Sequence, residues 1–197
     1  MAGILKVDQV QSDSNLAFAI AGSNVAFMNA TSLQMVGSNV SLAGTNVITN
    51  GKVVASAQPI GAVLQVVQAT YSTTTTSSTG AEQDTGLTAT ITPTSASSKI
   101  LVLVSQADCA KVDVQGPISL FLYRNSTAIY TITSQLLYQS PGASTRFAVN
   151  CSGSYLDSPA TTSAVTYKTT FTSSSGSTTR IQFGGTPSTI QLLEIAA

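Results

Sequence analysis

The chain has 197 residues, of which 43% are hydrophobic and only 8% charged, and its eight basic and eight acidic side chains cancel to a formal net charge of zero. No run of Lys or Arg offers the basic surface that nucleic acids or anionic membranes require, and the longest apolar run, Ile100 to Val104, is far too short to cross a bilayer. Histidine, the commonest general base and a frequent metal ligand, is absent, so we expect a protein that is not an enzyme and that binds no metal or cofactor.

Residues 1–21 are predicted to form an N-terminal anchor. The apolar residues of segment 4–10 have no clean period, whereas those of segment 16–20 alternate with small residues as in a half-buried strand. The segment has one Lys, early Asp residues and no long apolar core, so it does not have the pattern of a secretion signal. We expect assembly in the cytoplasm as part of something larger, and binding of another protein through Met1–Ile20.

Residues 22–57 repeat a unit of seven or eight residues: GSNVAFM, NATSLQMV, GSNVSLA, GTNVITN and GKVVASA. One unit is too short to bury its own apolar side chains, so such units become stable by stacking or by winding around other chains. Two apolar residues per unit make a stripe that a one-chain solenoid would leave exposed, which favours a β shaft of three intertwined chains. The residues predicted to face the trimer axis are Val25, Phe27, Leu33, Met35, Val40, Leu42 and Val47.

Residues 58–61 are predicted to be a hinge, and residues 62–197 a head domain. The head has longer apolar segments with turn signals roughly every 8–12 residues, and in segments 86–93 and 165–172 apolar and polar residues alternate. Together with the abundance of Ser and Thr, this pattern predicts an all-β protein whose head is an antiparallel, jelly-roll-like β-sandwich of eight or nine strands. The polar run 72–80 is expected to be an exposed loop.

Two predicted strands, Ile100–Val104 and Ile118–Tyr123, are apolar on both faces. In an antiparallel sandwich, such a strand needs a cover on its outer side as well as on its core side. The cover could be a loop of the same chain or another subunit, and together with the predicted shaft we interpret it as a subunit contact. The residues expected in the contact between heads are Leu101, Leu103, Phe121 and Tyr123.

This layout resembles the fibre-type virion proteins of tailed bacteriophages, particularly those of aquatic and cyanobacterial hosts. The resemblance is carried by the opening GILKVDQVQS, the Gly/Asn/Val-punctuated shaft, and the head segments SSKILVLVSQ, YLDSPATTSAVTYKTTF and IQLLEIA. Its most specific parts are Tyr155–Pro159 with Tyr167-Lys168, and Glu194-Ile195. The head is also similar in architecture to the trimeric jelly rolls of the C1q and tumour-necrosis-factor type. The resemblance implies a homotrimer that is attached to the virion by its N-terminus and carries an outward head.

Carboxylate pairs are the candidate reactive groups, because a glycosidase needs two acids about 5–10 Å apart. The chain offers the pairs Glu82/Asp84 and Asp108/Asp113, which we interpret as solvated loop carboxylates. Asp157 precedes Ser-Pro and is predicted to form a turn, the alternative being a calcium or sugar contact.

Other residues have structural and functional interpretations that remain open. Cys109 and Cys151 could form a disulfide, although two isolated cysteines on strands are more often small buried side chains. The pair Gly184-Gly185 is expected to form a turn. Four tyrosines could stack on sugars or belong to the core or an interface: Tyr71, Tyr130, Tyr138 and Tyr155.

The sequence therefore predicts a non-enzymatic structural component of a bacteriophage virion, a short trimeric fibre whose head contacts a host-surface glycan or a neighbouring virion protein. One alternative is a capsid decoration or cement protein of the same architecture. The other is a small tailspike-like polysaccharide hydrolase that would use Asp108, Asp113 or Glu82. Neither nucleic-acid binding nor membrane insertion is expected.

Overall fold

The computed structural model describes residues 39–42, 45–49, 52–53, 58–112, 116–137, 147–173 and 178–197. The chain divides into two compact units, 1–37 and 38–197, and the first lies outside the described residues together with the predicted anchor. The described residues are almost entirely β-structure, apart from one short 3-10 helix, η2 (Phe183–Gly185). None of their helices is long and apolar enough to span a membrane.

The last three repeat units each contribute one strand. These strands are β1 (Asn39–Leu42), β2 (Thr45–Thr49) and β3 (Lys52–Val53), and they form a three-stranded antiparallel sheet within one chain. The strands contain three of the predicted axis residues, Val40, Leu42 and Val47, and the other four (Val25, Phe27, Leu33 and Met35) lie outside the described residues.

The head contains ten strands in the described residues. The eight long ones are β4 (Val63–Tyr71), β6 (Gln83–Ile91), β7 (Lys99–Val112), β8 (Ile118–Arg124), β9 (Thr127–Leu136), β10 (Phe147–Asp157), β11 (Val165–Ser173) and β13 (Ser188–Ile195). Two short strands, β5 (Thr75–Ser77) and β12 (Thr178–Ile181), pair with each other, and β12 also pairs with the far end of β7. The run 72–80 is therefore not wholly an exposed loop, because β5 lies within it and Ser77 is buried.

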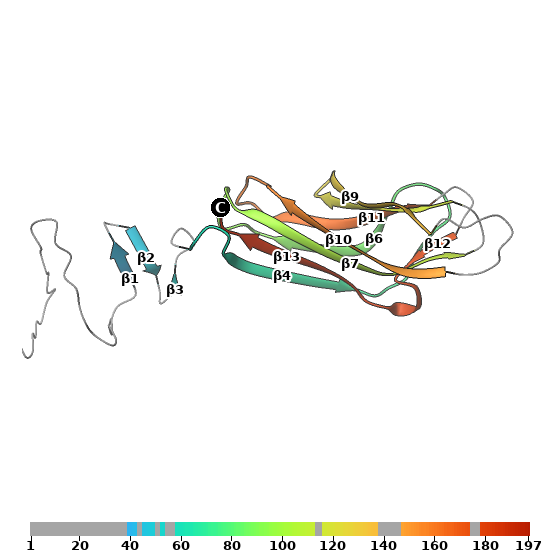
Figure 1. Ribbon diagram of the computed structural model, residues 1–197, viewed down its shortest axis with the longest axis horizontal. Helices are drawn as coiled ribbons and strands as arrows, with labels where there is room; N and C mark the ends of the chain where they lie inside the picture. The colour runs from blue at the N-terminus through green and yellow to red at the C-terminus, as the bar shows by residue number, and fades with distance from the viewer. Residues whose placement is uncertain are drawn as a thin grey trace, which may run out of the picture. The chain divides into compact units, whose positions relative to one another are not determined.

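The long strands pair as if one antiparallel ribbon had been rolled up. The first pairs with the last (β4 with β13), the second with the seventh (β6 with β11), the third with the sixth (β7 with β10) and the fourth with the fifth (β8 with β9). Two facing sheets result, β4-β13-β7-β10 and β6-β11-β8-β9 (Figure 1). This is the order of a jelly roll, and it confirms the predicted all-β sandwich.

The core between the sheets comprises two apolar clusters. The first includes Leu87, Ile91, Ile100, Val102, Leu122, Tyr167, Ile190 and Leu192, and the second Cys109, Ile118, Leu120, Phe171 and Ile181. On β6, β11 and β13 the inward residues alternate with more exposed ones, as the sequence period requires.

A buried polar layer lies between the two clusters along the strands. Gln106 Nε2 on β7 donates to Ser188 Oγ on β13 at 2.8 Å, and Gln106 Oε1 accepts from Thr169 Oγ1 on β11 at 2.9 Å. The Thr169 hydroxyl lies 2.6 Å from that of Thr85 on β6. These four buried side chains join both sheets, so the layer fixes how one sheet lies over the other.

Candidate functional site

A row of apolar side chains crosses the outer face of the β4-β13-β7-β10 sheet. Val66 pairs with Leu193, Leu193 with Leu101, and Leu101 with Leu156, so one residue from each of the four strands lies on the same outer row. Val66 is 59% exposed and Leu156 49%, although both are large hydrophobic residues. The row therefore has no cover within the described part of the chain.

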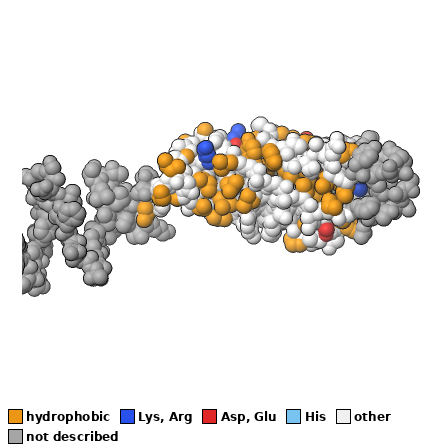
Figure 2. All heavy atoms as spheres, in the orientation of Figure 1, with side chains coloured by type: hydrophobic (Ala, Val, Ile, Leu, Met, Phe, Trp, Pro, Cys, Tyr) orange, Lys and Arg blue, Asp and Glu red, His pale blue; other side chains and the backbone are white. Residues whose placement is uncertain are grey.

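Neighbouring rows extend this row into a patch. Val63, 52% exposed, pairs with Ile195 on one side, and on the other side Leu103 pairs with Gln191. Figure 2 shows hydrophobic side chains gathered over β4, β13 and β7. We call this patch the apolar face; it consists of Val63, Val66, Leu101, Leu103, Leu156, Leu193 and Ile195.

The four residues predicted to form the contact between heads lie on both sheets. Leu101 and Leu103 lie on the apolar face, half-buried, as a strand with two apolar sides requires. Phe121 and Tyr123 lie on the outer face of the other sheet, where they pair with Thr170 and Lys168 of β11. The structure therefore does not bring the two pairs together on one protomer.

A hollow of 180 Å³ lies beside Tyr123 on this second sheet. We call it the Tyr123 hollow; it is formed by Glu82, Gln83, Asp84, Tyr123, Lys168 and Thr170. Lys168 Nζ contacts Asp84 Oδ1 at 2.8 Å and Oδ2 at 3.0 Å, and it lies 5.8 Å from the centre of the Tyr123 ring. Thr170 Oγ1 donates to Glu82 Oε1 at 2.5 Å.

The hollow carries an excess of negative charge, because two carboxylates face one ammonium group. The pKa of Tyr123 is raised, first by its hydrogen bond to Glu82, then by burial and by the charges of Glu82 and Asp84. The phenol therefore stays protonated at neutral pH. The site offers carboxylate acceptors, an ammonium donor and a phenol around one aromatic ring.

Asp157 has a different role from the predicted one. It is the last residue of β10, only 5% exposed, and it does not form a turn. Its carboxylate accepts from Arg124 Nη1 at 2.9 and 3.0 Å and from the Tyr167 hydroxyl at 2.6 Å. The pKa of Tyr167 is raised, mainly by burial and then by its hydrogen bond to Asp157. The group joins the two sheets and is structural.

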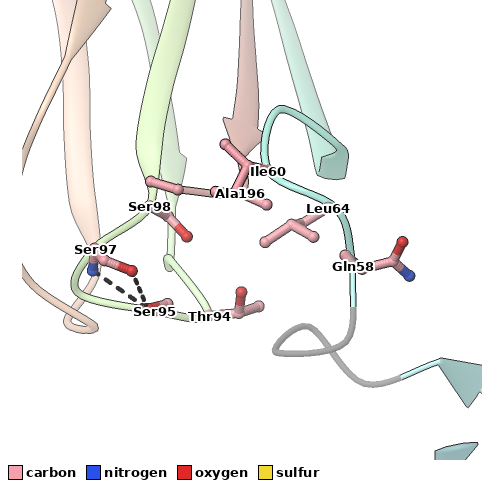
Figure 3. A pocket seen from close by; sticks show the side chains of 9 residues that line it. Gln58, Ile60, Leu64, Thr94, Ser95, Ser97, Ser98 and Ala196 are labelled. Atoms are coloured by element: carbon pink, nitrogen blue, oxygen red, sulfur yellow. Dashed lines mark hydrogen bonds between the residues drawn. The ribbon is translucent and has the colours of Figure 1, made fainter. Parts of the chain in front are cut away.

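A larger cavity of 600 Å³ lies at the end of the head where the chain enters it (Figure 3). Its wall combines apolar side chains, Ile60 and Leu64, with the hydroxyls of Thr94, Ser95, Ser97 and Ser98. No charged side chain lines it among the described residues.

Glu194 is fully buried near this end of the head. Its Oε1 accepts from the Thr94 amide and hydroxyl, both at 2.7 Å, and its Oε2 accepts from Gln65 Nε2 at 2.6 Å. Burial disfavours the charged form, but the hydrogen bonds from Gln65 and Thr94 outweigh it and lower the pKa of Glu194. This carboxylate ties β13 to the connection between β6 and β7.

The other acidic candidates are not gathered into a reaction centre. Asp108 lies within β7, near a register shift against β10, has a φ of 40°, and accepts a hydrogen bond from the Thr186 hydroxyl. Asp113 lies outside the described residues. Within the described ranges, no group of three or more Cys, Asp or Glu side chains could hold a metal ion.

The cysteines and tyrosines have mostly structural environments. Cys109 is buried and Cys151 half-buried, and neither forms a disulfide in the structure. Tyr130 and Tyr155 stack with ring centres 5.2 Å apart, and Tyr71 packs against the core, whereas Tyr138 lies outside the described residues. Gly184 and Gly185 belong to η2 and both have positive φ, as the predicted turn requires.

Sequence reasoning missed part of the apolar face and the partner of Asp84. Adjacent apolar pairs, Val66-Val67 and Leu192-Leu193, signal strands that are apolar on both sides and could have identified β4 and β13. Nothing local signals the pairing of Lys168 with Asp84, because it depends on which strands become neighbours.

No protein-family model matches the chain, and no curated protein is significantly similar in sequence. Among solved structures, the VP2 subviral particle of infectious bursal disease virus has a TM-score of 0.40 at 13% identity, covering 67% of this chain and 32% of that one. The Gx strain of the same virus gives 0.36 at 15% identity, covering 68% and 39%. This chain spans about a third of the length of the solved chains it matches.

Proposed function

We propose that this protein is a non-enzymatic structural component of a bacteriophage virion: a short homotrimeric fibre, anchored by residues 1–21, with an outward jelly-roll head. The observation that carries the proposal is the apolar face. A sheet surface bearing seven apolar side chains and no carboxylate, with Lys99 beside Ile195 at one end, is unusual for a protein that stays monomeric.

The apolar face is proposed to turn toward a threefold axis, so that three copies of the Val66–Leu193–Leu101–Leu156 row meet in one dry interior. Cyclic symmetry repeats the same contact around the axis and closes the assembly, which leaves no apolar surface free for further growth. Leu101 and Leu103 belong to this contact. Phe121 and Tyr123 lie on the other sheet, and we place them outside it.

The repeat supports the same assembly. Three consecutive units each form one short strand of a narrow antiparallel sheet, as units that stack on their neighbours do. Because these strands pair within one chain, the three chains are proposed to meet through side chains rather than by exchanging strands. The residues proposed for that axis are Val25, Phe27, Leu33, Met35, Val40, Leu42 and Val47.

The oligomeric state tests the proposal. Sedimentation or light scattering of the full chain is expected to give three times the chain mass of 20.1 kDa. Leu101→Gln should dissociate the trimer while the circular dichroism of the sandwich is retained, since Leu101 lies outside the core. Phe121→Gln is the matched control on the other sheet and should remain trimeric. A folded monomer from the unaltered chain, or dissociation by the control alone, would contradict the proposal.

The position of this protein on the virion would distinguish a tail fibre from a capsid decoration protein. Antibody raised against the head is expected to label the tail region of intact particles in electron micrographs. Labelling spread over the capsid would favour a decoration or cement protein of the same architecture. The hydrolase alternative has less support, because Asp84 is held by Lys168 and Glu82 by Thr170.

A further inference from the structure

We infer that the Tyr123 hollow is a binding site for a neutral saccharide. The inference rests on the proposed function, in which the head of the fibre contacts a glycan on the host surface, and it names the kind of sugar and the site. It starts from the geometry of one site on the rigid β6-β11-β8-β9 sheet.

Charge is concentrated at this site although it is scarce elsewhere. Only 8% of the chain is charged, yet Glu82, Asp84 and Lys168 surround one tyrosine on a sheet face otherwise rich in threonine. Several of the remaining charges in the described residues are buried and serve the fold, as Asp157 and Glu194 do. A solvated sheet face gains little stability from such an ion pair, so stability does not account for the cluster.

A bulge in β6 brings Asp84 to the hollow. Lys168 pairs with Thr88, but two residues later Thr170 pairs with Asp84, so β6 has extra residues between these two points. Gly86 lies within the bulge with a φ of 89°, and a Cβ there would lie 2.2 Å from Tyr71 Cε1, so any other residue would be strained and would displace the Tyr71 ring. Bulges commonly re-aim side chains next to functional sites. Here the result is a carboxylate beside both Lys168 and Thr170.

The chemistry of the lining selects a neutral ligand rich in hydroxyl groups. Carboxylates of Glu82 and Asp84 accept hydrogen bonds from neighbouring hydroxyls, and Lys168 donates to a ring or hydroxyl oxygen. Lys168 Nζ lies over the Tyr123 ring, so C–H groups of the sugar pack against the part of the ring that Lys168 leaves open. The excess negative charge disfavours anionic sugars. Two carboxylates, one of them bound to an ammonium group, are too few for a calcium site.

The size of the hollow limits the ligand to one sugar unit. Its 180 Å³ lies below the roughly 300–1,000 Å³ of ordinary small-molecule sites, so a single residue of a glycan is bound while the rest stays in solvent. One unit on a shallow site binds weakly, with a Kd on the order of 1 mM. Three copies on one trimer would bind a glycan-covered surface far more tightly.

Nuclear magnetic resonance of the full chain tests the assignment. The probes are methyl α-D-glucopyranoside, methyl β-D-galactopyranoside and N-acetyl-D-glucosamine, with N-acetylneuraminic acid as the anionic comparison. At least one neutral sugar should receive saturation transfer and shift the amides of residues 82–84, 123 and 168–170. Tyr123→Ala and Asp84→Asn should each weaken this binding by about tenfold or more.

Matched variants control for general effects of the substitutions. Lys168→Met removes the ammonium donor of the hollow and should also weaken the binding. Two substitutions on the other sheet are the controls: Asp108→Asn removes a carboxylate and Lys99→Met an ammonium group, and neither should change the binding. The inference is overturned if no neutral sugar perturbs the hollow, if binding survives Tyr123→Ala, or if the anionic sugar binds in preference. Repeating the titration on Leu101→Gln distinguishes the sugar site from the trimer proposal. If Leu101→Gln is a monomer and still binds sugar, the sugar site does not depend on the trimer.

Discussion

The Tyr167 hydroxyl on β11 donates a hydrogen bond of 2.6 Å to Asp157 Oδ2 on β10 across the interior of the sandwich. Arg124 on β8 neutralises the same carboxylate through both of its oxygens. Three strands from two sheets thus share one buried acidic group, whereas the exposed pair of Lys168 and Asp84 lies on a single sheet. The two ion pairs should therefore differ sharply in their contribution to stability.

Replacing Asp157 by alanine should lower the free energy of unfolding by about 3 kcal/mol, because it leaves a buried hydroxyl and a half-buried guanidinium without their acceptor. Asp84→Ala removes the exposed pair and should cost less than about 1 kcal/mol. Urea unfolding followed by circular dichroism measures both. Equal costs for the two variants would show that the buried group contributes no more than a surface pair.

Glu194 should make the head less stable in acid. Its pKa in the folded state is lowered from 4.5, so the unfolded chain takes up the proton more readily. The stabilisation is complete above about pH 4.5 and is lost as the pH falls through the folded-state value. Glu194→Gln should flatten this acid limb in a series of urea titrations.

Thr94→Val provides the control for Glu194, because it keeps the carboxyl group and removes one donor to Oε1. The loss of that donor should raise the pKa of Glu194 and shift the acid limb to higher pH. An acid limb that stays unchanged in both variants would mean that Glu194 does not govern it.

Replacing only one residue of the buried polar layer should lower the stability of the head more than replacing its partners as well. Gln106→Met removes one hydrogen-bond partner each from the buried hydroxyls of Ser188 and Thr169, which keep the Ala107 amide and the Thr85 hydroxyl as their other partners. The variant should cost about 1–3 kcal/mol. Adding Thr169→Val and Ser188→Ala should restore part of the loss, since apolar groups of similar shape no longer need partners. Additive losses in a double-mutant cycle would show that the layer is not a coupled network.

Cys109 should be nearly inert toward thiol reagents in the folded head. Burial, followed by the nearby Cys151 and Asp108, raises its pKa to about 12, so almost no thiolate exists at neutral pH. Alkylation with iodoacetamide at pH 8, read by mass spectrometry, should therefore modify the half-buried Cys151 before Cys109. Equal rates under native conditions would contradict the burial of Cys109, and unfolding in urea should equalise them.

The strand pattern was predictable because it is local. Leu87, Ala89 and Ile91 alternate with polar residues in the sequence and are buried in the structure, and the outer exposure of Leu101 follows from two apolar sides on one strand. The role of Asp157 was not predictable, because its partners come from strands distant in sequence. Leu101 and Tyr123 lie on different sheets because their strands join different sheets. The alternation of apolar and polar residues within a strand does not determine which sheet the strand joins.

The jelly-roll topology places the first strand of the head, β4, beside its last strand, β13. Gly61 N donates to Ala196 O and Ala196 N to Ala62 O, both at 2.8 Å, and beyond them β4 and β13 pair along their whole length. Tension applied through residues 58–62 would pull β4 along its own axis, so all of its bonds to β13 must shear at once instead of opening one by one. A head paired in this way resists being pulled apart along the direction of β4.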